Sequence, residues 1–244
     1  SGSHWPRILA TVACTHAEQC SVEDGALACL GGCGIELADG CRGNLIQGNH
    51  VYEVGSNGIN VGGANDEQLT PKGNRVENNC VHACGGDDYG AVGIWVGMSQ
   101  RTVVAHNLVY DLPYTGISLG WGWCNVETAV KNNKVKYNHI YDVMKVLNDG
   151  AGIYSLSRQD GTEISQNYIH DVGRGIEADW WAGNHGIYLD NGSTNLTVYA
   201  NLLENIPGSP ALKVQTWGTD ATNNKLVVFN KQELVSFNGP DAQQ

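Results

Sequence analysis

The chain contains 244 residues, enough for one large domain or two small ones with a sizeable hydrophobic core. Its 14 basic and 25 acidic side chains give a net charge of −11, which argues against binding to nucleic acids, anionic membranes and polyanionic polysaccharides, and favours a neutral or cationic partner. With 41% hydrophobic and 16% charged residues the chain is not disordered, and it contains no apolar run long enough to span a membrane.

A phrase centred on asparagine returns along the chain, as in 46–51 (IQGNHV) and 135–140 (VKYNHI). Each copy has an aliphatic residue three positions before the asparagine and another two positions after it. This alternation of apolar and polar residues predicts short strands with one buried face. The repeated asparagines are separated by 30, 28, 31, 29 and 34 residues: Asn49, Asn79, Asn107, Asn138, Asn167 and Asn201.

A second phrase begins with Gly-Ile and follows an asparagine by 9 to 19 residues, at 58–61, 93–96, 116–119, 152–155 and 186–189. Two or three short strands per repeat of about 30 residues, without a helical period, are typical of a solenoid. The sequence therefore predicts an all-β, right-handed parallel β-helix of about eight coils, forming a single domain over residues 1–244. We expect the repeated asparagines to stack as an internal amide ladder.

Eight cysteines and eight histidines are scattered through the repeats. Neighbouring coils bring residues within disulfide reach, so the cysteines fit either one or two disulfides near the N-terminal end or packing of thiols inside the coils. His50 and His139 directly follow a repeated asparagine, whereas His82 and His170 lie three positions after one, which indicates inheritance of the repeat. We expect no metal site and no cofactor.

The strands that begin with Gly-Ile point their isoleucine inward, so the next residue points outward. Aromatic residues occupy this outward position in three coils, and two tryptophans lie in an adjoining turn. A row of exposed aromatic rings is a platform for sugars, whose apolar faces stack on Trp and Tyr. The residues expected to line a saccharide site are Trp95, Trp121, Trp123, Tyr154, Arg158, His185 and Tyr188.

Two carboxylates flank this row. Asp149 lies three residues before Gly152 and Asp190 lies four residues after Gly186, so they belong to adjacent coils at opposite ends of the strands. A pair of carboxylates beside a groove supplies the acid and the base or nucleophile that glycoside hydrolysis needs. An aspartate in a glycine-rich turn also caps backbone N–H groups, and the sequence leaves both interpretations open.

Five segments, in this order, resemble the β-helix core of glycoside hydrolase family 141, which includes α-L-fucosidases and xylanases: 91–96, 113–123, 137–144, 148–154 and 186–190. By this resemblance Asp149 and Asp190 match the proposed catalytic carboxylates. The chain departs from that family in lacking a long N-terminal portion and in having Asn191 where glutamate is usual.

A β-helix of this size also looks like the xylan-binding modules of family 89, which occur attached to xylanases. The resemblance implies an extracellular, non-catalytic module that binds xylan or a related neutral plant polysaccharide and is joined in its parent chain to a glycoside hydrolase domain. The alternative is a small glycoside hydrolase of the xylanase or α-L-fucosidase type that uses Asp149 and Asp190.

Overall fold

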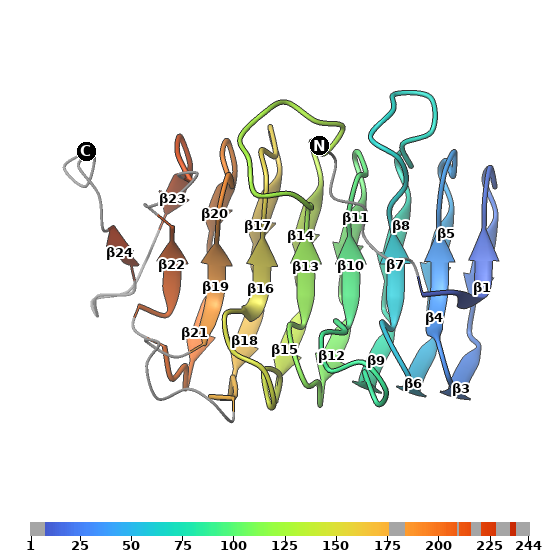
Figure 1. Cartoon of the computed structure of the whole chain (residues 1–244), viewed down its shortest axis with the longest axis horizontal. Coiled ribbons are helices and arrows are strands. Elements are labelled where there is room, and N and C mark those ends of the chain that lie inside the picture. The colour runs from blue at the N-terminus through green and yellow to red at the C-terminus, as the bar shows by residue number, and fades with distance from the viewer. Residues whose placement is uncertain (1–7, 176–183, 209, 216–220, 228–234, 238–244) are drawn as a thin grey trace.

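The computed structural model describes residues 8–175, 184–208, 210–215, 221–227 and 235–237. Within these residues every named element is a β-strand, and the strands form three parallel sheets that run along one axis (Figure 1). The described residues contain no helix of the length and apolarity needed to cross a membrane. The chain visits the three sheets in turn, so each strand from β1 to β20 pairs with the strand three positions later, and β22 pairs with β24.

Sheet 1 contains, in spatial order, β1 (Ala10–Cys14), β4 (Cys33–Leu37), β7 (Ile59–Val61), β10 (Ile94–Val96), β13 (Ile117–Leu119), β16 (Ala151–Ser155), β19 (His185–Leu189), β22 (Leu212–Val214) and β24 (Val235–Phe237). Sheet 2 contains β2 (Ser21–Glu23), β5 (Leu45–Gln47), β8 (Arg75–Glu77), β11 (Val103–Ala105), β14 (Lys134–Lys136), β17 (Glu163–Ser165), β20 (Thr197–Tyr199) and β23 (Lys225–Val227). Sheet 3 contains β3 (Ala26–Leu30), β6 (His50–Val54), β9 (Cys80–Cys84), β12 (Leu108–Tyr110), β15 (His139–Tyr141), β18 (Tyr168–His170) and β21 (Leu202–Glu204).

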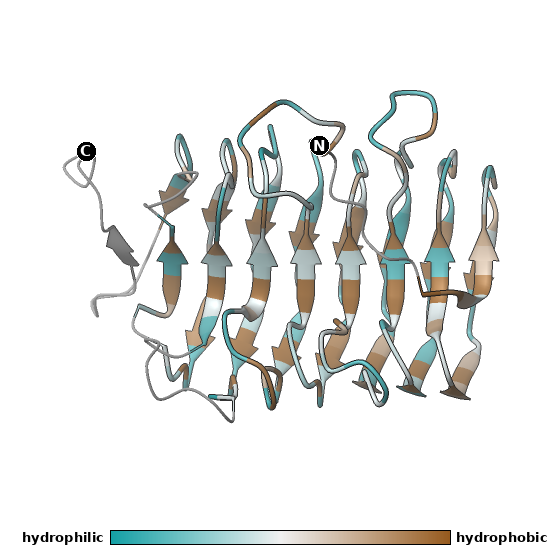
Figure 2. Ribbon diagram, viewed as in Figure 1, coloured by the Kyte–Doolittle hydropathy of each residue, from teal (hydrophilic) through white to brown (hydrophobic). Residues whose placement is uncertain are grey.

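The core runs through the centre of the three sheets because the same repeat position points inward in every coil. In Figure 2 the hydrophobic bands of sheet 1 recur at the same height from strand to strand. The isoleucines of the five Gly-Ile phrases, together with Ile35 of the preceding Gly34-Ile35, pair in register and have no exposed surface: Ile35, Ile59, Ile94, Ile117, Ile153 and Ile187. These observations confirm the predicted right-handed parallel β-helix.

The predicted amide ladder is present at the turn that precedes sheet 3. Each side chain donates from Nδ2 to Oδ1 of the asparagine in the next coil, at 3.1 Å from Asn49 to Asn79 and 3.0 Å from Asn79 to Asn107. The same Oδ1 atoms accept the backbone N–H of the preceding asparagine, as in the 3.0 Å bond from Asn79 to Asn107. The ladder continues through Asn138 and Asn167 to Asn201.

A shorter amide row, which we did not predict, lies at the turn before sheet 2. Asn44 donates from Nδ2 to Asn74 Oδ1 at 3.0 Å. Two coils after Asn74 the equivalent position is Asn133, whose Oδ1 accepts the backbone N–H of Thr102. Thr162 continues this function, because its hydroxyl accepts the backbone N–H of Asn133 at 3.3 Å. Mixed residue types at these positions conceal the row in the sequence.

The glycine of the Gly-Ile phrase is required by the close approach of the next coil. A Cβ added at Gly152 would lie 2.5 Å from Ile169 Cγ2 and 2.9 Å from the carbonyl oxygen of Gly186. Gly116 has the same environment, with Ile140 Cγ2 at 2.6 Å and the Gly152 oxygen at 2.8 Å from the added atom. Because backbone carbonyls cannot move aside in a paired strand, any larger residue at these positions is strained.

We expect the substitution Gly152→Ala to lower the free energy of unfolding by about 1–3 kcal/mol through this overpacking. Chemical denaturation followed by circular dichroism measures the change. Gly31→Ala is the matched control, because a Cβ at Gly31 meets no atom within 4 Å. Equal stabilities of the two variants would contradict the interpretation.

All eight cysteines lie in the described residues, and all are free thiols. Cys33, Cys41 and Cys84 are buried, which agrees with the packing interpretation for those three. Cys20 and Cys29 are exposed instead, so packing does not account for every thiol. Burial raises the pKa of the Cys84 thiol to about 12, which keeps it protonated and unreactive.

Candidate functional site

A pocket of about 290 Å³ lies over the outer face of sheet 1, and we call it the site pocket. Its floor consists of Trp95, Ser118 and Tyr154, which pair in register on the neighbouring strands β10, β13 and β16. The small Ser118 side chain between two large rings leaves the hollow. The residues that line the pocket are Gly90, Val92, Trp95, Tyr114, Ser118, Leu119, Gly120, Trp121, Trp123, Asp149, Tyr154 and Leu156.

One wall of the site pocket is the loop that follows β13. Trp121 and Trp123 pack edge to face on this loop, with ring centroids 5.0 Å apart and an angle of 67° between the ring planes. The next residue of the loop, Cys124, lies against Gly192 in the turn after β19. The two backbones are so close that a Cβ added at Gly192 would lie 2.3 Å from the Cys124 carbonyl oxygen. Trp123 is 51% exposed, so its indole is available to a ligand at the pocket rim.

The prediction that the aromatic rings are exposed is wrong for the three residues on the strands. Trp95, Tyr154 and Tyr188 point outward from the coil but are only 5%, 8% and 2% exposed. The Trp95 indole packs closely against Gly62 and Gly97, where an added Cβ would collide with it. The two tyrosines join a small apolar cluster on the outside of sheet 1, against which Trp121 packs. The loops between strands therefore turn an open platform into a pocket.

Asp190 follows β19 and is buried, with 4% of its surface exposed. The hydroxyl of Tyr154 donates a hydrogen bond to Asp190 Oδ2, and Asn191 Nδ2 donates to Asp190 Oδ1 at 3.1 Å. Burial and the negative charge of Asp190 raise the pKa of Tyr154, so the phenol keeps its proton as the donor. Asp190 is therefore held in one orientation by side chains of its own and the preceding coil.

Asp149 precedes β16 and reaches the site pocket from the opposite side. It is exposed, and its backbone has a positive φ of 60°, a conformation that is uncommon outside glycine and tolerated by Asp and Asn. The hydroxyl of Tyr114 donates to the Asp149 carbonyl oxygen at 2.9 Å and fixes this turn. Desolvation and the charge of Asp190 raise the pKa of the Asp149 carboxyl, and Lys213 opposes the shift.

The charge of Asp190 helps to raise the pKa of the Asp149 carboxyl, so the two carboxylates lie close enough to interact. A carboxyl group with a raised pKa retains its proton to higher pH and serves as an acid, while an ionised neighbour serves as a base or nucleophile. Asp190 accepts hydrogen bonds from side chains rather than capping a turn, so the turn-capping interpretation does not describe its carboxylate.

The residues expected from the sequence to line the site do not include two residues of this region, Tyr114 and Lys213. Tyr114 lines the site pocket, and its only signal in the sequence is its position just before a Gly-Ile phrase. Lys213 lies on β22, and its Nζ is 4.3 Å from the ring centroid of Tyr188. Burial lowers the pKa of Lys213, while Asp149 and Asp190 act to raise it. A positive charge thus balances part of the negative charge of the two carboxylates.

Arg158 was expected to line the saccharide site, but it is not among the residues that line the site pocket. Its Nε donates to both carboxylate oxygens of Asp160, at 2.8 and 3.1 Å. The backbone of Arg158 forms an isolated parallel β-bridge with Thr194 of the next coil. This ion pair directs the guanidinium toward the turn between sheets 1 and 2.

Comparison with known proteins identifies the fold. Residues 9–226 match the family model described as the right-handed β-helix region. The chain belongs to the right-handed β-helix family. No curated protein sequence matches this β-helix protein.

A solved structure described as a glycoside hydrolase shares the β-helix fold, with a TM-score of 0.75 and 24% sequence identity over 96% of this chain. This β-helix protein spans 39% of the length of that hydrolase. A second structure, described as a complex of XylC with xylose, has a TM-score of 0.44 and 12% identity over 70% of this chain and 32% of the other.

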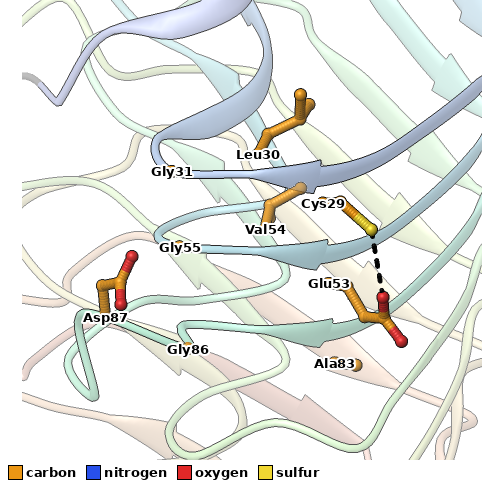
Figure 3. Close-up of a pocket in the computed structure, with 9 residues that line it drawn as sticks. All are labelled: Cys29, Leu30, Gly31, Glu53, Val54, Gly55, Ala83, Gly86 and Asp87. Atoms are coloured by element: carbon orange, nitrogen blue, oxygen red, sulfur yellow. Dashed lines mark hydrogen bonds between the residues drawn. The ribbon is translucent and has the colours of Figure 1, made fainter.

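A second hollow of the β-helix protein, of about 460 Å³, lies where sheet 3 turns toward sheet 1 near the N-terminal end (Figure 3). Its lining comprises Cys29, Leu30, Gly31, Glu53, Val54, Gly55, Ala83, Gly86 and Asp87. The Cys29 thiol donates to Glu53 Oε2 at 3.3 Å across one side of the hollow. This lining contains no aromatic ring on which a sugar could stack, so we assign the candidate saccharide site to the site pocket.

His185 is buried beside the site rather than inside the pocket. Its Nδ1 donates to the carbonyl oxygen of Pro210 at 2.7 Å, and its ring packs edge to face on Tyr188 with centroids 5.3 Å apart. Burial lowers the pKa of His185 to about 4, so the ring is neutral at pH 7. We infer that it positions Tyr188.

Acidification is expected to destabilise the protein through His185. Between pH 6.5 and about 4 the unfolded histidine is protonated and the folded one is not, so the unfolded state binds more protons and the free energy of unfolding falls as the pH falls. The contribution of this group is complete above pH 6.5 and amounts to roughly 3 kcal/mol. Denaturation between pH 7 and 4 should show a smaller loss of stability in His185→Gln than in the wild type. His106→Gln, at an exposed position, serves as the control, and equal pH slopes in all three proteins would contradict the prediction.

Proposed function

We propose that this β-helix protein binds a neutral polysaccharide of the xylan type, with sugar rings entering the site pocket beside Trp121 and Trp123. The observation that carries the proposal is the half-exposed Trp123 indole at the rim of a pocket whose floor is also aromatic. Indole faces stack on the apolar faces of sugar rings, while carboxylates such as Asp149 accept hydrogen bonds from sugar hydroxyls.

The size and charge of the site support this class of ligand. A pocket of about 290 Å³ lies near the lower end of the range for small-molecule sites, which suits one or two sugar units of a chain. The acidic surface disfavours uronic-acid polymers, and the choice of xylan among neutral glycans rests on the sequence resemblance. Because xylan is an insoluble polymer of the plant cell wall, we propose an extracellular location and association with a glycoside hydrolase domain in the parent chain.

A second candidate function, hydrolysis of the bound glycan, is favoured by one observation. Asp149 and Asp190 approach the pocket region from opposite sides, and the charge of Asp190 helps to raise the pKa of Asp149. In this candidate Asp149 protonates the glycosidic oxygen, and Asp190 acts as the base or nucleophile.

Isothermal calorimetry with soluble xylan and then xylohexaose tests both candidates. Heat that saturates and returns to baseline indicates binding, and gives the affinity and the number of sites. A sustained displacement of the baseline indicates turnover and favours hydrolysis. The absence of heat with both ligands would overturn the assignment to xylan.

We expect Trp123→Ala to weaken xylohexaose binding by about 1–3 kcal/mol, which is roughly a 5- to 150-fold rise in Kd, because a stacking surface is lost. Tyr137→Ala is the matched control, since Tyr137 is 41% exposed and stacks on His106, away from the pocket lining. Wild-type affinity in the Trp123 variant would show that the ligand binds elsewhere.

A further inference from the structure

The outer face of sheet 3 carries a continuous stack of aromatic rings, one from each of five neighbouring coils. The ring centroids are 4.6–5.4 Å apart and the ring planes lie within 11° of parallel. The members of this stack are Tyr52, His82, Tyr110, Tyr141 and His170. The imidazole of His82 is therefore held in a fixed plane between the phenols of Tyr52 and Tyr110.

Beside this stack three potential metal ligands converge. His50 on β6 lies directly opposite Cys80 on β9, and His82 follows two residues after Cys80, so all three point to the same face of the sheet. One ligand atom from each residue, a ring nitrogen from the histidines and the Cys80 sulfur, lies within 4.8 Å of the other two, and the Nε2 atoms of the two histidines are 2.7 Å apart. His50 is exposed, while Cys80 and His82 are half-buried, so an ion can reach the cluster from solvent.

We propose that His50, Cys80 and His82 form a zinc-binding site that links two coils and leaves the fourth coordination position open to water. Zinc binds imidazole nitrogen at about 2.0–2.1 Å and thiolate sulfur at about 2.3 Å in tetrahedral geometry, which places two nitrogen ligands about 3.3 Å apart. The two imidazoles need to separate by only roughly 0.6 Å from their present contact to reach that spacing.

Burial raises the pKa of the Cys80 thiol, so zinc has to displace its proton on binding. The neighbouring Tyr110 hydroxyl acts in the opposite direction, and an outer contact of this kind orients a metal ligand. Imidazole and thiolate together favour zinc over magnesium or calcium, which prefer oxygen ligands. This site departs from our sequence-based expectation of no metal, which treated the histidines as inherited repeat positions.

The same face of sheet 3 contains a second histidine pair that lacks the cysteine, and it serves as a comparison for the proposed site. His139 on β15 and His170 on β18 repeat the histidine pair, with their Nε2 atoms 2.8 Å apart. The residue opposite His139 is Tyr168, where the first pair has Cys80. A hydrogen bond between the two imidazoles accounts for the second pair, but it does not explain a thiol placed against the first.

Zinc titration of the full chain, stripped with a chelator and kept reduced without thiol reagents, tests the proposal. We expect one tight site per chain, competing with a chromophoric chelator. Cobalt bound in place of zinc should give the intense visible bands of tetrahedral cobalt and a thiolate charge-transfer band. Cys80→Ala should weaken zinc binding by more than about 100-fold and abolish that band, because loss of a ligand exceeds the loss of an outer contact. Zinc should raise the melting temperature of the wild type but not of the variant.

Cys29→Ala removes an exposed cysteine outside the cluster, and His139→Ala removes a histidine from the second pair, so both should bind zinc as the wild type does. Tyr168→Cys should create a second site and raise the stoichiometry from one to two. If Cys80→Ala fails to fold, His50→Gln tests the same site at an exposed position. The proposal is overturned by the absence of a tight site in the wild type, by wild-type affinity in Cys80→Ala or His50→Gln, or by bound cobalt without a thiolate band.

Discussion

Replacing Asn107 by alanine is expected to lower the free energy of unfolding by about 3 kcal/mol or more, because one rung of the internal ladder serves two coils. Its Oδ1 accepts the backbone N–H and the Nδ2 of Asn79, both at 3.0 Å. Its Nδ2 donates to the carbonyl oxygen of Val76 at 2.9 Å. Asn107 is 1% exposed, so water cannot replace these partners without opening the turn. Each buried polar group left unpaired costs about 1–3 kcal/mol.

Urea denaturation monitored by circular dichroism measures this loss. Asn125→Ala is the control, because Asn125 is exposed in a loop outside the ladder, and it should change stability by less than about 0.5 kcal/mol. A change in the denaturant slope of the Asn107 variant would indicate that the coils on either side unfold separately, as expected for a solenoid whose coils contact only their neighbours. Equal stability of the two variants would show that the ladder contributes little.

The coil architecture could be predicted because its determinants recur at the same position in every repeat. Each Gly-Ile phrase specifies a strand entry where only glycine fits, followed by a fully buried isoleucine, as at Gly152 and Ile153. Each repeated asparagine specifies a turn whose backbone groups it satisfies. A parallel stack in which one position always points inward follows from this periodicity.

The candidate site could be predicted only in part because its shape depends on loops that do not repeat. The outward direction of Tyr154 follows from strand alternation, but its burial depends on the loop that carries Trp121. Arg158 was assigned to the site from its place after a strand, whereas Asp160, two residues later, pairs with it locally. Asp149 and Asp190 were placed correctly at opposite strand ends, since those positions belong to the repeat.

The side-chain conformations on sheet 3 lay outside what spacing can specify. The sequence places His50 and His82 on adjacent coils, and strand pairing puts Cys80 opposite His50. Whether two imidazoles meet or diverge depends on their rotamers, which here are constrained by the ring stack through Tyr52 and Tyr110. Repeat patterns therefore predict which residues share a face, and packing decides which atoms touch.

Substituting Asp149 by asparagine separates the two candidate functions with the largest expected effect. Asparagine has nearly the same shape and tolerates the positive φ at this position, so the pocket and the affinity for xylohexaose should be retained within about 3-fold. If the protein hydrolyses the glycan, loss of the proton donor should reduce kcat by about 10²- to 10⁴-fold. Product release measured by a reducing-sugar assay and Kd measured by calorimetry give the two quantities on the same sample.

The pH dependence of that turnover supplies the control for mechanism. An acid with a raised pKa is active while protonated, so kcat should fall as the pH rises through the pKa of Asp149, at a higher pH than an ordinary aspartate would allow. This fall in kcat at high pH should be absent from Asp149→Asn. It should be present in Asp87→Asn, because Asp87 lines the other hollow. A wild type without turnover, together with unchanged affinity in Asp149→Asn, would leave binding as the function and make Asp149 a hydrogen-bonding group. A kcat in Asp149→Asn equal to that of the wild type would instead exclude this residue as the acid, because an amide cannot donate the proton that the leaving oxygen requires.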